Sequence, residues 1–138
     1  MTPVEIIDFI NAHLMCQLAT VDGNVPRVRG MMAYRADARG IIFHTGRAKD
    51  LAAQLERNPN VEACFFDPGR RVQVRVAGRA EILNDPALRD EIVEARPFLK
   101  PVVERFGPDM MVLFRVGECV ATVWTMEDNL APKKYVRL

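Results

Sequence analysis

The spacing of apolar residues changes several times along the chain, and each change predicts where a helix gives way to strands. Residues 3–13 are predicted to form an amphipathic helix, because apolar side chains recur every three or four positions behind a capping box made by Thr2 and Glu5. The apolar positions of this helix are Val4, Ile7, Ile10 and Leu14. The chain therefore opens with a helix that has one face to bury.

Six or seven strands are predicted after this helix, from period-two alternation or from short apolar runs. Their ranges are 15–20, 25–35, 41–45, 61–66, 71–83, 111–116 and 119–125, the last two forming a hairpin about Gly117-Glu118. Within 71–83, apolar and polar residues alternate, so one face of that strand is expected to be buried, and Gly78 marks a bulge or a bend. Tight turns join most of the strands, which favours antiparallel pairing.

Short helices are predicted between and after these strands. One covers residues 48–57, a second starts at Asp85-Pro86, and a third follows the breaks at Pro97 and Pro101. The tail, residues 126–138, shows no periodicity. The predicted architecture is a mainly β (α+β) fold, in which a small antiparallel barrel hides its strand edges and short helices flank it.

Composition narrows the classes of protein that this chain fits. Its 138 residues suit one domain, 1–138, and a formal net charge of +1 argues against a dedicated nucleic-acid binder. Three isolated cysteines are typical of buried thiols in a reducing cytoplasm. No apolar run approaches the roughly 18 residues that would span a membrane. Because Glu5 and Asp8 interrupt the N-terminal segment, it does not read as a signal peptide.

A candidate phosphate site lies where the 41–45 strand meets the next helix. His44 and Thr45 end the strand, and Lys49 is expected in the first helical turn, where free N–H groups and the helix dipole favour an anion. Arg27 and Arg29, two positions apart on the preceding strand, would face the same way. Each residue alone is common on a solvated surface, but their joint order favours an anion site.

Two further residues are candidates for contact with a flat heterocycle. Gln73 offers an amide donor and acceptor on the polar face of the 71–83 strand, although an ordinary exposed position is equally compatible with the pattern. Trp124 could be a core residue, stack on a ring or close a dimer seam. Rossmann, P-loop, zinc-protease and nucleophile-elbow motifs are absent.

In order, these segments resemble the pyridoxamine 5′-phosphate oxidase-like family. The matching segments are P-x-x-R at 26–29, D-x-x-G-I-I-F-H-T at 37–45, R-A-K at 47–49, N-P at 58–59 and Q-V-R-V-x-G at 73–78. The resemblance implies a six- to seven-stranded antiparallel split β-barrel that binds FMN and works as a homodimer, with the flavin at the subunit interface. It is clear over residues 15–83 and loose beyond them.

By position, the resemblance assigns flavin-binding roles to several residues. Arg29, Thr45 and Lys49 match residues that contact the FMN phosphate or ribityl chain, and Gln73 matches a glutamine near the ring. The backbone of Gly30, Met31 and Met32 would run under the ring, His44 takes the place of a tyrosine, and Arg27 is a neighbour of the site. Trp124 is a candidate for contact with the flavin.

Differences from the family pattern leave the activity open. Tyr34 stands where the oxidases carry a substrate-binding lysine, and residues 129–138 lack their arginine and histidine motif, so vitamin B6 oxidation is not expected. The main hypothesis is a flavin-dependent oxidoreductase with a small-molecule substrate or electron donor. The alternatives are a non-enzymatic flavin or electron carrier, and a deazaflavin or haem protein. A barrel binding single-stranded nucleic acid, suggested by an arginine-rich strand, is disfavoured because that strand has no aromatic residues for base stacking.

Overall fold

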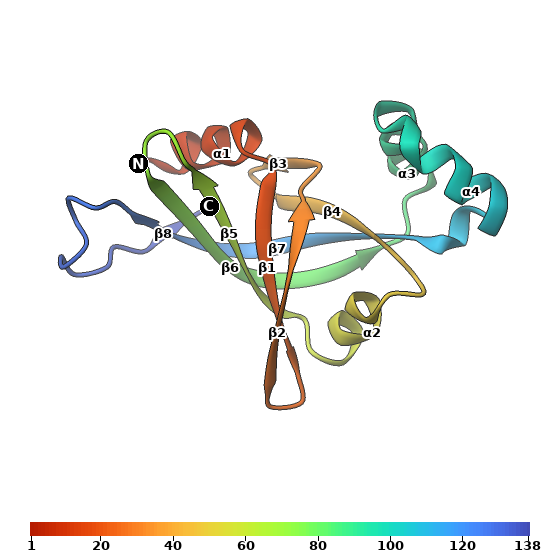
Figure 1. Ribbon diagram of the computed structural model, residues 1–138, viewed down its shortest axis with the longest axis horizontal. Helices are drawn as coiled ribbons and strands as arrows, with labels where there is room; N and C mark the ends of the chain where they lie inside the picture. Colours follow the sequence, from red (N-terminus) through yellow and green to blue (C-terminus); the bar gives the residue numbers. More distant parts are fainter.

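Eight antiparallel strands form one strongly curved sheet, and four short helices surround it (Figure 1). The computed structural model describes residues 1–138. Along the sheet the strands follow the order β2-β1-β5-β6-β7-β4-β3, and β8 pairs with β7. Their bounds are β1 Met15–Asp22, β2 Val25–Met32, β3 Arg35–Asp37, β4 Gly40–Gly46, β5 Asn60–Asp67, β6 Val72–Leu83, β7 Met111–Trp124 and β8 Val136–Arg137. The predicted mainly β (α+β) class is confirmed, with more strands than the six or seven expected.

The single strand predicted over residues 25–35 is wrong, because the chain changes partner in the middle of it. β2 pairs with β1 as far as Met32, whereas β3 pairs with β4. Between them the N–H of Ala33 donates to Leu14 O at 2.8 Å and the N–H of Tyr34 donates to Ile42 O at 2.8 Å. This change of partner joins the two ends of the strand order and curls the sheet into a barrel.

The predicted hairpin about Gly117-Glu118 is also wrong, because β7 runs straight through these residues. β6 pairs with β7 on both sides of them, and the register shifts between Ala77 and Arg79. Glu118 has a φ of 53°, and a Cβ on Gly78 would lie 2.6 Å from Gly117 O. A glycine and a positive φ suit a bulge as well as a turn, and here they form a bulge that bends two long strands. The bulge predicted at Gly78 is therefore confirmed.

The main core fills the inside of the curved sheet and is closed at one end by α1, Pro3–Ala12 (Figure 1). The predicted capping box of Thr2 and Glu5 is present, with the Glu5 N–H donating to Thr2 Oγ1 at 3.2 Å. Ile6, Phe9 and Ile10 form the buried stripe of this helix. Val4, predicted to face inward, is 66% exposed, because the helix is rotated to place Ile6 and Phe9 over the barrel.

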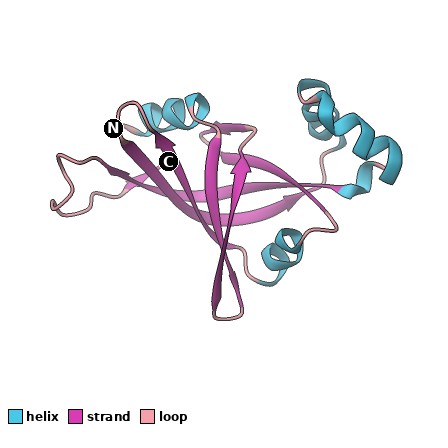
Figure 2. Cartoon of the chain, in the orientation of Figure 1, coloured by secondary structure: helices cyan, strands magenta, loops and turns pink.

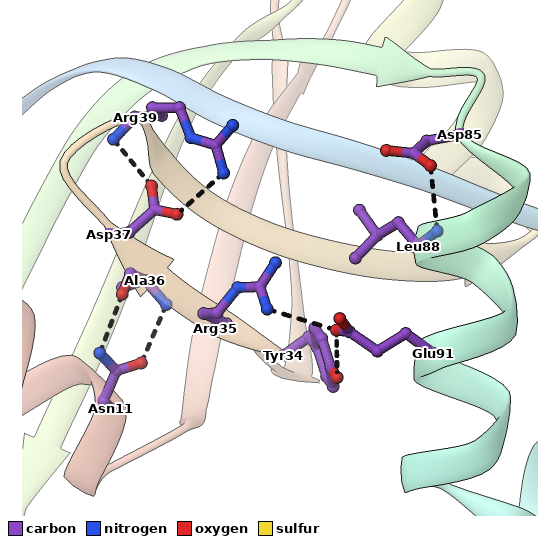
Figure 3. Close-up of polar contacts among 9 residues, drawn as sticks. All are labelled: Asn11, Tyr34, Arg35, Ala36, Asp37, Arg39, Asp85, Leu88 and Glu91. Atoms are coloured by element: carbon purple, nitrogen blue, oxygen red, sulfur yellow. Dashed lines mark hydrogen bonds and ion pairs between the residues drawn. The ribbon is translucent and has the colours of Figure 1, made fainter.

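The remaining helices are α2, Asp50–Arg57, α3, Pro86–Ala95, and α4, Lys100–Phe106 (Figure 2). The predicted cap of α3 is present, because Asp85 accepts a hydrogen bond from the Leu88 N–H at 3.0 Å. Helix α3 is tied to the sheet by Glu91, which accepts from Tyr34 Oη at 2.6 Å and from Arg35 at 3.3 Å (Figure 3). None of the helices is long and apolar enough to cross a bilayer.

Candidate functional site

A cavity of about 720 Å³ opens between the β1–β2 hairpin and α2. In Figure 1 the hairpin projects from the barrel and α2 lies beside it. We call this cavity the α2 groove, and thirteen residues line it: Asp22, Arg27, Val28, Arg29, Gly30, Met31, Thr45, Lys49, Asp50, Leu51, Ala53, Gln54 and Arg57. Its volume lies in the range of small-molecule sites, roughly 300–1,000 Å³. Six of the ten predicted site residues are among its walls.

At one end of the groove, the start of α2 presents several hydrogen-bond donors. Lys49 is the N-cap residue, one position before the first turn in which it was predicted, and no side chain caps the helix. Thr45 is only 7% exposed, yet its hydroxyl borders the groove and makes no hydrogen bond within the chain. The N–H of Arg47 donates to Met110 O at 2.7 Å, which fixes the loop between β4 and α2. Uncapped helix N–H groups, a hydroxyl and an ammonium group therefore face one space, an arrangement that suits an anion.

A buried hydrogen-bond network, which the sequence did not reveal, holds Arg29 in place. Its guanidinium donates to Thr20 Oγ1 at 2.8 Å and to Gln54 Oε1 at 2.5 Å, and the Thr20 hydroxyl donates to the same Gln54 oxygen at 2.7 Å. Thr20 and Gln54 are 2% and 4% exposed. Burial lowers the pKa of Arg29, and the nearby Asp50 carboxylate partly opposes this effect. The network fixes Arg29 against α2 and leaves some of its guanidinium N–H groups available to the groove.

The outer rim of the groove carries a second group of charges around Asp22. This carboxylate lies 3.6 Å from Arg27 Nε and 3.6 Å from Arg57 Nη2. Asp50 is the other acidic residue of the lining, whereas the basic residues are Arg27, Arg29, Lys49 and Arg57. The lining thus has a formal excess of two positive charges, which favours an anionic ligand.

His44 lies outside the groove, because adjacent residues of a strand point to opposite faces of the sheet. Its Nε2 is 2.7 Å from Nη1 of Arg96, a buried arginine that also donates to Ala33 O at 2.6 Å. Burial, then the charges of Arg96 and Lys49, lower the pKa of His44 to about 4. We therefore assign His44 to a neutral, structural contact with the segment between α3 and α4.

Gln73 and Trp124 face a different cavity, of about 470 Å³. They are register partners on β6 and β7, and the indole Nε1 donates to Asn129 Oδ1 at 2.8 Å. Met32 lines neither cavity and belongs to the exposed face of β2. Within one chain, Gln73 and Trp124 therefore lie apart from the predicted phosphate residues, whereas Gly30 and Met31, also predicted near the ring, line the α2 groove.

Comparison with known proteins gives one family. The family described as pyridoxamine 5′-phosphate oxidase matches residues 3–116. Pyridoxine/pyridoxamine 5′-phosphate oxidase of Anaeromyxobacter dehalogenans is 41% identical over 81 residues, which are 58% of this chain and 40% of that protein. General stress protein 26 of Bacillus subtilis is 31% identical over 91 residues, 64% of either chain. The matched part of the chain thus spans less than half of the oxidase.

The fold also matches solved structures at low sequence identity. A NimC/NimA family protein from Clostridium acetobutylicum has a TM-score of 0.79 at 18% identity, over 98% of this chain and 92% of that one. At this identity the likeness shows the fold alone, and it confirms the predicted split-barrel architecture.

Proposed function

The chain belongs to the pyridoxamine 5′-phosphate oxidase family, whose members generally bind a flavin, and we propose that it is an FMN-dependent oxidoreductase. The observation that carries the proposal is the convergence of unpaired donors at the start of α2. The Thr45 hydroxyl, the Lys49 ammonium group and the start of α2, which no side chain caps, border a positively charged cavity. This donor set fits a phosphate ester, which accepts several charge-assisted hydrogen bonds.

In the proposed complex each residue of the groove has a distinct role. Lys49 and the N-terminus of α2 would neutralise the phosphate, and Thr45 would donate a hydrogen bond to it. Arg29, fixed by Gln54 and Thr20, would hold the sugar chain or phosphate with its remaining N–H groups. Met31 and Gly30 would line the path of the ring. The bound flavin would supply hydride or electron transfer, while the protein supplies position and charge.

We further propose a homodimer in which a second copy completes this site. Gln73 and Trp124 are turned into another cavity, so one chain alone does not bring them to the groove. The β1–β2 hairpin also exposes large apolar side chains, of which Met15, Val28 and Met32 share one face. Apolar surface of this kind is typical of an interface. A partner copy seated there would add its own Gln73 and Trp124 to the flavin ring.

The proposed setting is the cytoplasm, which the chemistry of the cysteines supports. All three are free thiols, and burial raises the pKa of Cys16 to about 12 and of Cys119 to about 11. Such thiols are unreactive because the thiolate form is suppressed.

A purely electron-carrying role would share the same flavin groove. Steady-state oxidation of NAD(P)H with a nitro compound or quinone as acceptor separates an enzyme from a carrier.

The proposal is tested by titrating the purified protein with FMN and recording its visible spectrum. Thr45→Ala and Lys49→Ala should each weaken binding about tenfold or more, the usual worth of a hydrogen bond to a charged group. Lys100→Ala serves as the matched control, because this lysine of α4 pairs with Glu94 of α3 and lines neither cavity. Absence of FMN binding, or equal affinity for all four proteins, would refute the proposal.

A further inference from the structure

We propose that Arg47 is a positioning residue, which holds the loop between β4 and α2 in the shape that a bound phosphate requires. This role rests on the proposed function, because the anion site is the same. Arg47 itself does not line the α2 groove, whereas its neighbours Thr45 and Lys49 do. It therefore acts on the phosphate through the placing of these two residues and of the helix that follows them.

The loop between β4 and α2 has little packing of its own. Residues 47–50 are all exposed, and no side chain caps the first turn of α2. β4 ends at Gly46, which pairs with Met111, and the Lys49 N–H donates back to Gly46 O at 3.0 Å. A short exposed segment stays ordered only where hydrogen bonds attach it to the rest of the protein. The direction of the Lys49 ammonium group therefore depends on such attachments.

Arg47 supplies two attachments, and both go to η2, the 3-10 turn Pro108–Met110 that lies between α4 and β7 (Figure 1). Its backbone N–H donates to Met110 O at 2.7 Å, and its side-chain Nε donates to Asp109 O at 2.8 Å. Two bonds from one residue to consecutive carbonyl groups fix both the position and the direction of the loop. Groups that contact a ligand are held accurately only when neighbouring hydrogen bonds support them in this way.

The turn η2 is itself firmly held, because it ends the helical segment that begins with α3. It follows directly on α4, where the Gly107 N–H donates to Val103 O at 2.8 Å. Between α3 and α4, the buried Arg96 donates to Ala33 O at 2.6 Å and so ties this segment to the junction of β2 and β3. The helices α3 and α4 line no part of the α2 groove, and they support it through Arg47.

Charge alone is the other way in which Arg47 would assist a phosphate, and two variants separate the two roles. Arg47→Gln removes the charge but keeps an N–H donor bonded to Cδ, where arginine carries Nε. Arg47→Met has a similar length and keeps neither the charge nor the donor. A positioning role is therefore retained by glutamine and lost with methionine, whereas a charge role is lost with both.

The test is to measure the dissociation constants of FMN and riboflavin by flavin fluorescence for the wild type and the variants. Arg47→Met should weaken FMN binding about tenfold and riboflavin binding less than about twofold, because riboflavin has no phosphate to be placed. Arg47→Gln should stay within about threefold of the wild type for both flavins. The matched control is Arg39→Met, because Arg39 is also exposed, bonds to Asp37 and lines neither cavity (Figure 3).

Each outcome decides between the roles. Weaker FMN binding in Arg47→Met alone, with riboflavin unchanged, supports the positioning role. Equal losses in Arg47→Gln and Arg47→Met, an unchanged FMN affinity in Arg47→Met, or a parallel loss of riboflavin binding would overturn that role while leaving the flavin proposal intact. A wild-type protein that binds FMN no better than riboflavin would refute the phosphate site itself, and the role of Arg47 with it.

Discussion

Gln54 is predicted to be one of the most sensitive positions for stability, although nothing in its sequence context marks it. Gln54→Leu keeps the side-chain size but removes the oxygen that accepts from Thr20 at 2.7 Å and from Arg29 at 2.5 Å. Losing one neutral and one charged hydrogen bond costs about 1 and 1.5–3 kcal/mol, and the added apolar burial returns about 1 kcal/mol. The net loss should be about 1.5–3 kcal/mol, or on the order of 10 °C in Tm for a domain of this size.

The matched control is Gln54→Glu, which keeps an acceptor for both partners and adds an opposite charge beside Arg29. Its loss should be less than half that of the leucine variant, because attraction to Arg29 offsets part of the cost of burying the carboxylate. Urea unfolding followed by circular dichroism gives the free energies. A leucine variant within about 0.5 kcal/mol of the wild type, where ordinary surface substitutions fall, would show that the network does not hold Arg29.

Three further predictions concern the strands and their attached helices. Gly78→Ala should destabilise the protein by about 1–3 kcal/mol, because the new Cβ would lie 2.6 Å from a backbone oxygen, whereas Gly30→Ala meets nothing closer than 3.9 Å and should be nearly neutral in thermal unfolding. The pKa of His44 is lowered to about 4 in the folded protein, so as the pH falls the unfolded chain binds a proton on this residue before the folded chain does. The free energy of unfolding should therefore fall by about 2–3 kcal/mol between pH 7.5 and 4.5. His44→Gln should remove that part of the pH dependence in urea titrations; an identical slope would contradict the assignment. Asp85→Ala should lower the unfolding free energy by about 1 kcal/mol through loss of the α3 cap, and a neutral result would refute that role.

The features that were best predicted from the sequence are those that depend only on residues close together along the chain. The alternation along β6 and the Asp85 cap are local, and both are present in the structure. The break at Ala33–Tyr34 was missed because it depends on which strands lie on either side, information that the local pattern does not contain. Gly117-Glu118 was misread because a turn and a bulge use the same backbone conformations, and only the position of β6 decides between them.

The residues of the candidate site divide in the same way, into contacts that the local sequence predicts and contacts that depend on distant parts of the chain. Thr45 and Lys49 could be placed together because one short loop joins their elements. The buried contact of Gln54 with Thr20 joins residues 34 positions apart and leaves no local signal. The position of His44 was available from the sequence, since period two already separates it from Thr45. Gln73 and Trp124 could be paired only once the register of β6 and β7 was known.

The central claim is that a phosphate binds where β4 meets α2, and the most direct measurement compares FMN with riboflavin, which lacks only the phosphate. The dissociation constants of both are measured for the wild type and for the double variant Thr45→Ala, Lys49→Ala. The wild type should prefer FMN by at least about a hundredfold, the worth of two or more charged hydrogen bonds, and the double variant by less than about tenfold. Equal binding of FMN and riboflavin by the wild type, or a preference for FMN that survives in the double variant, would contradict the assignment.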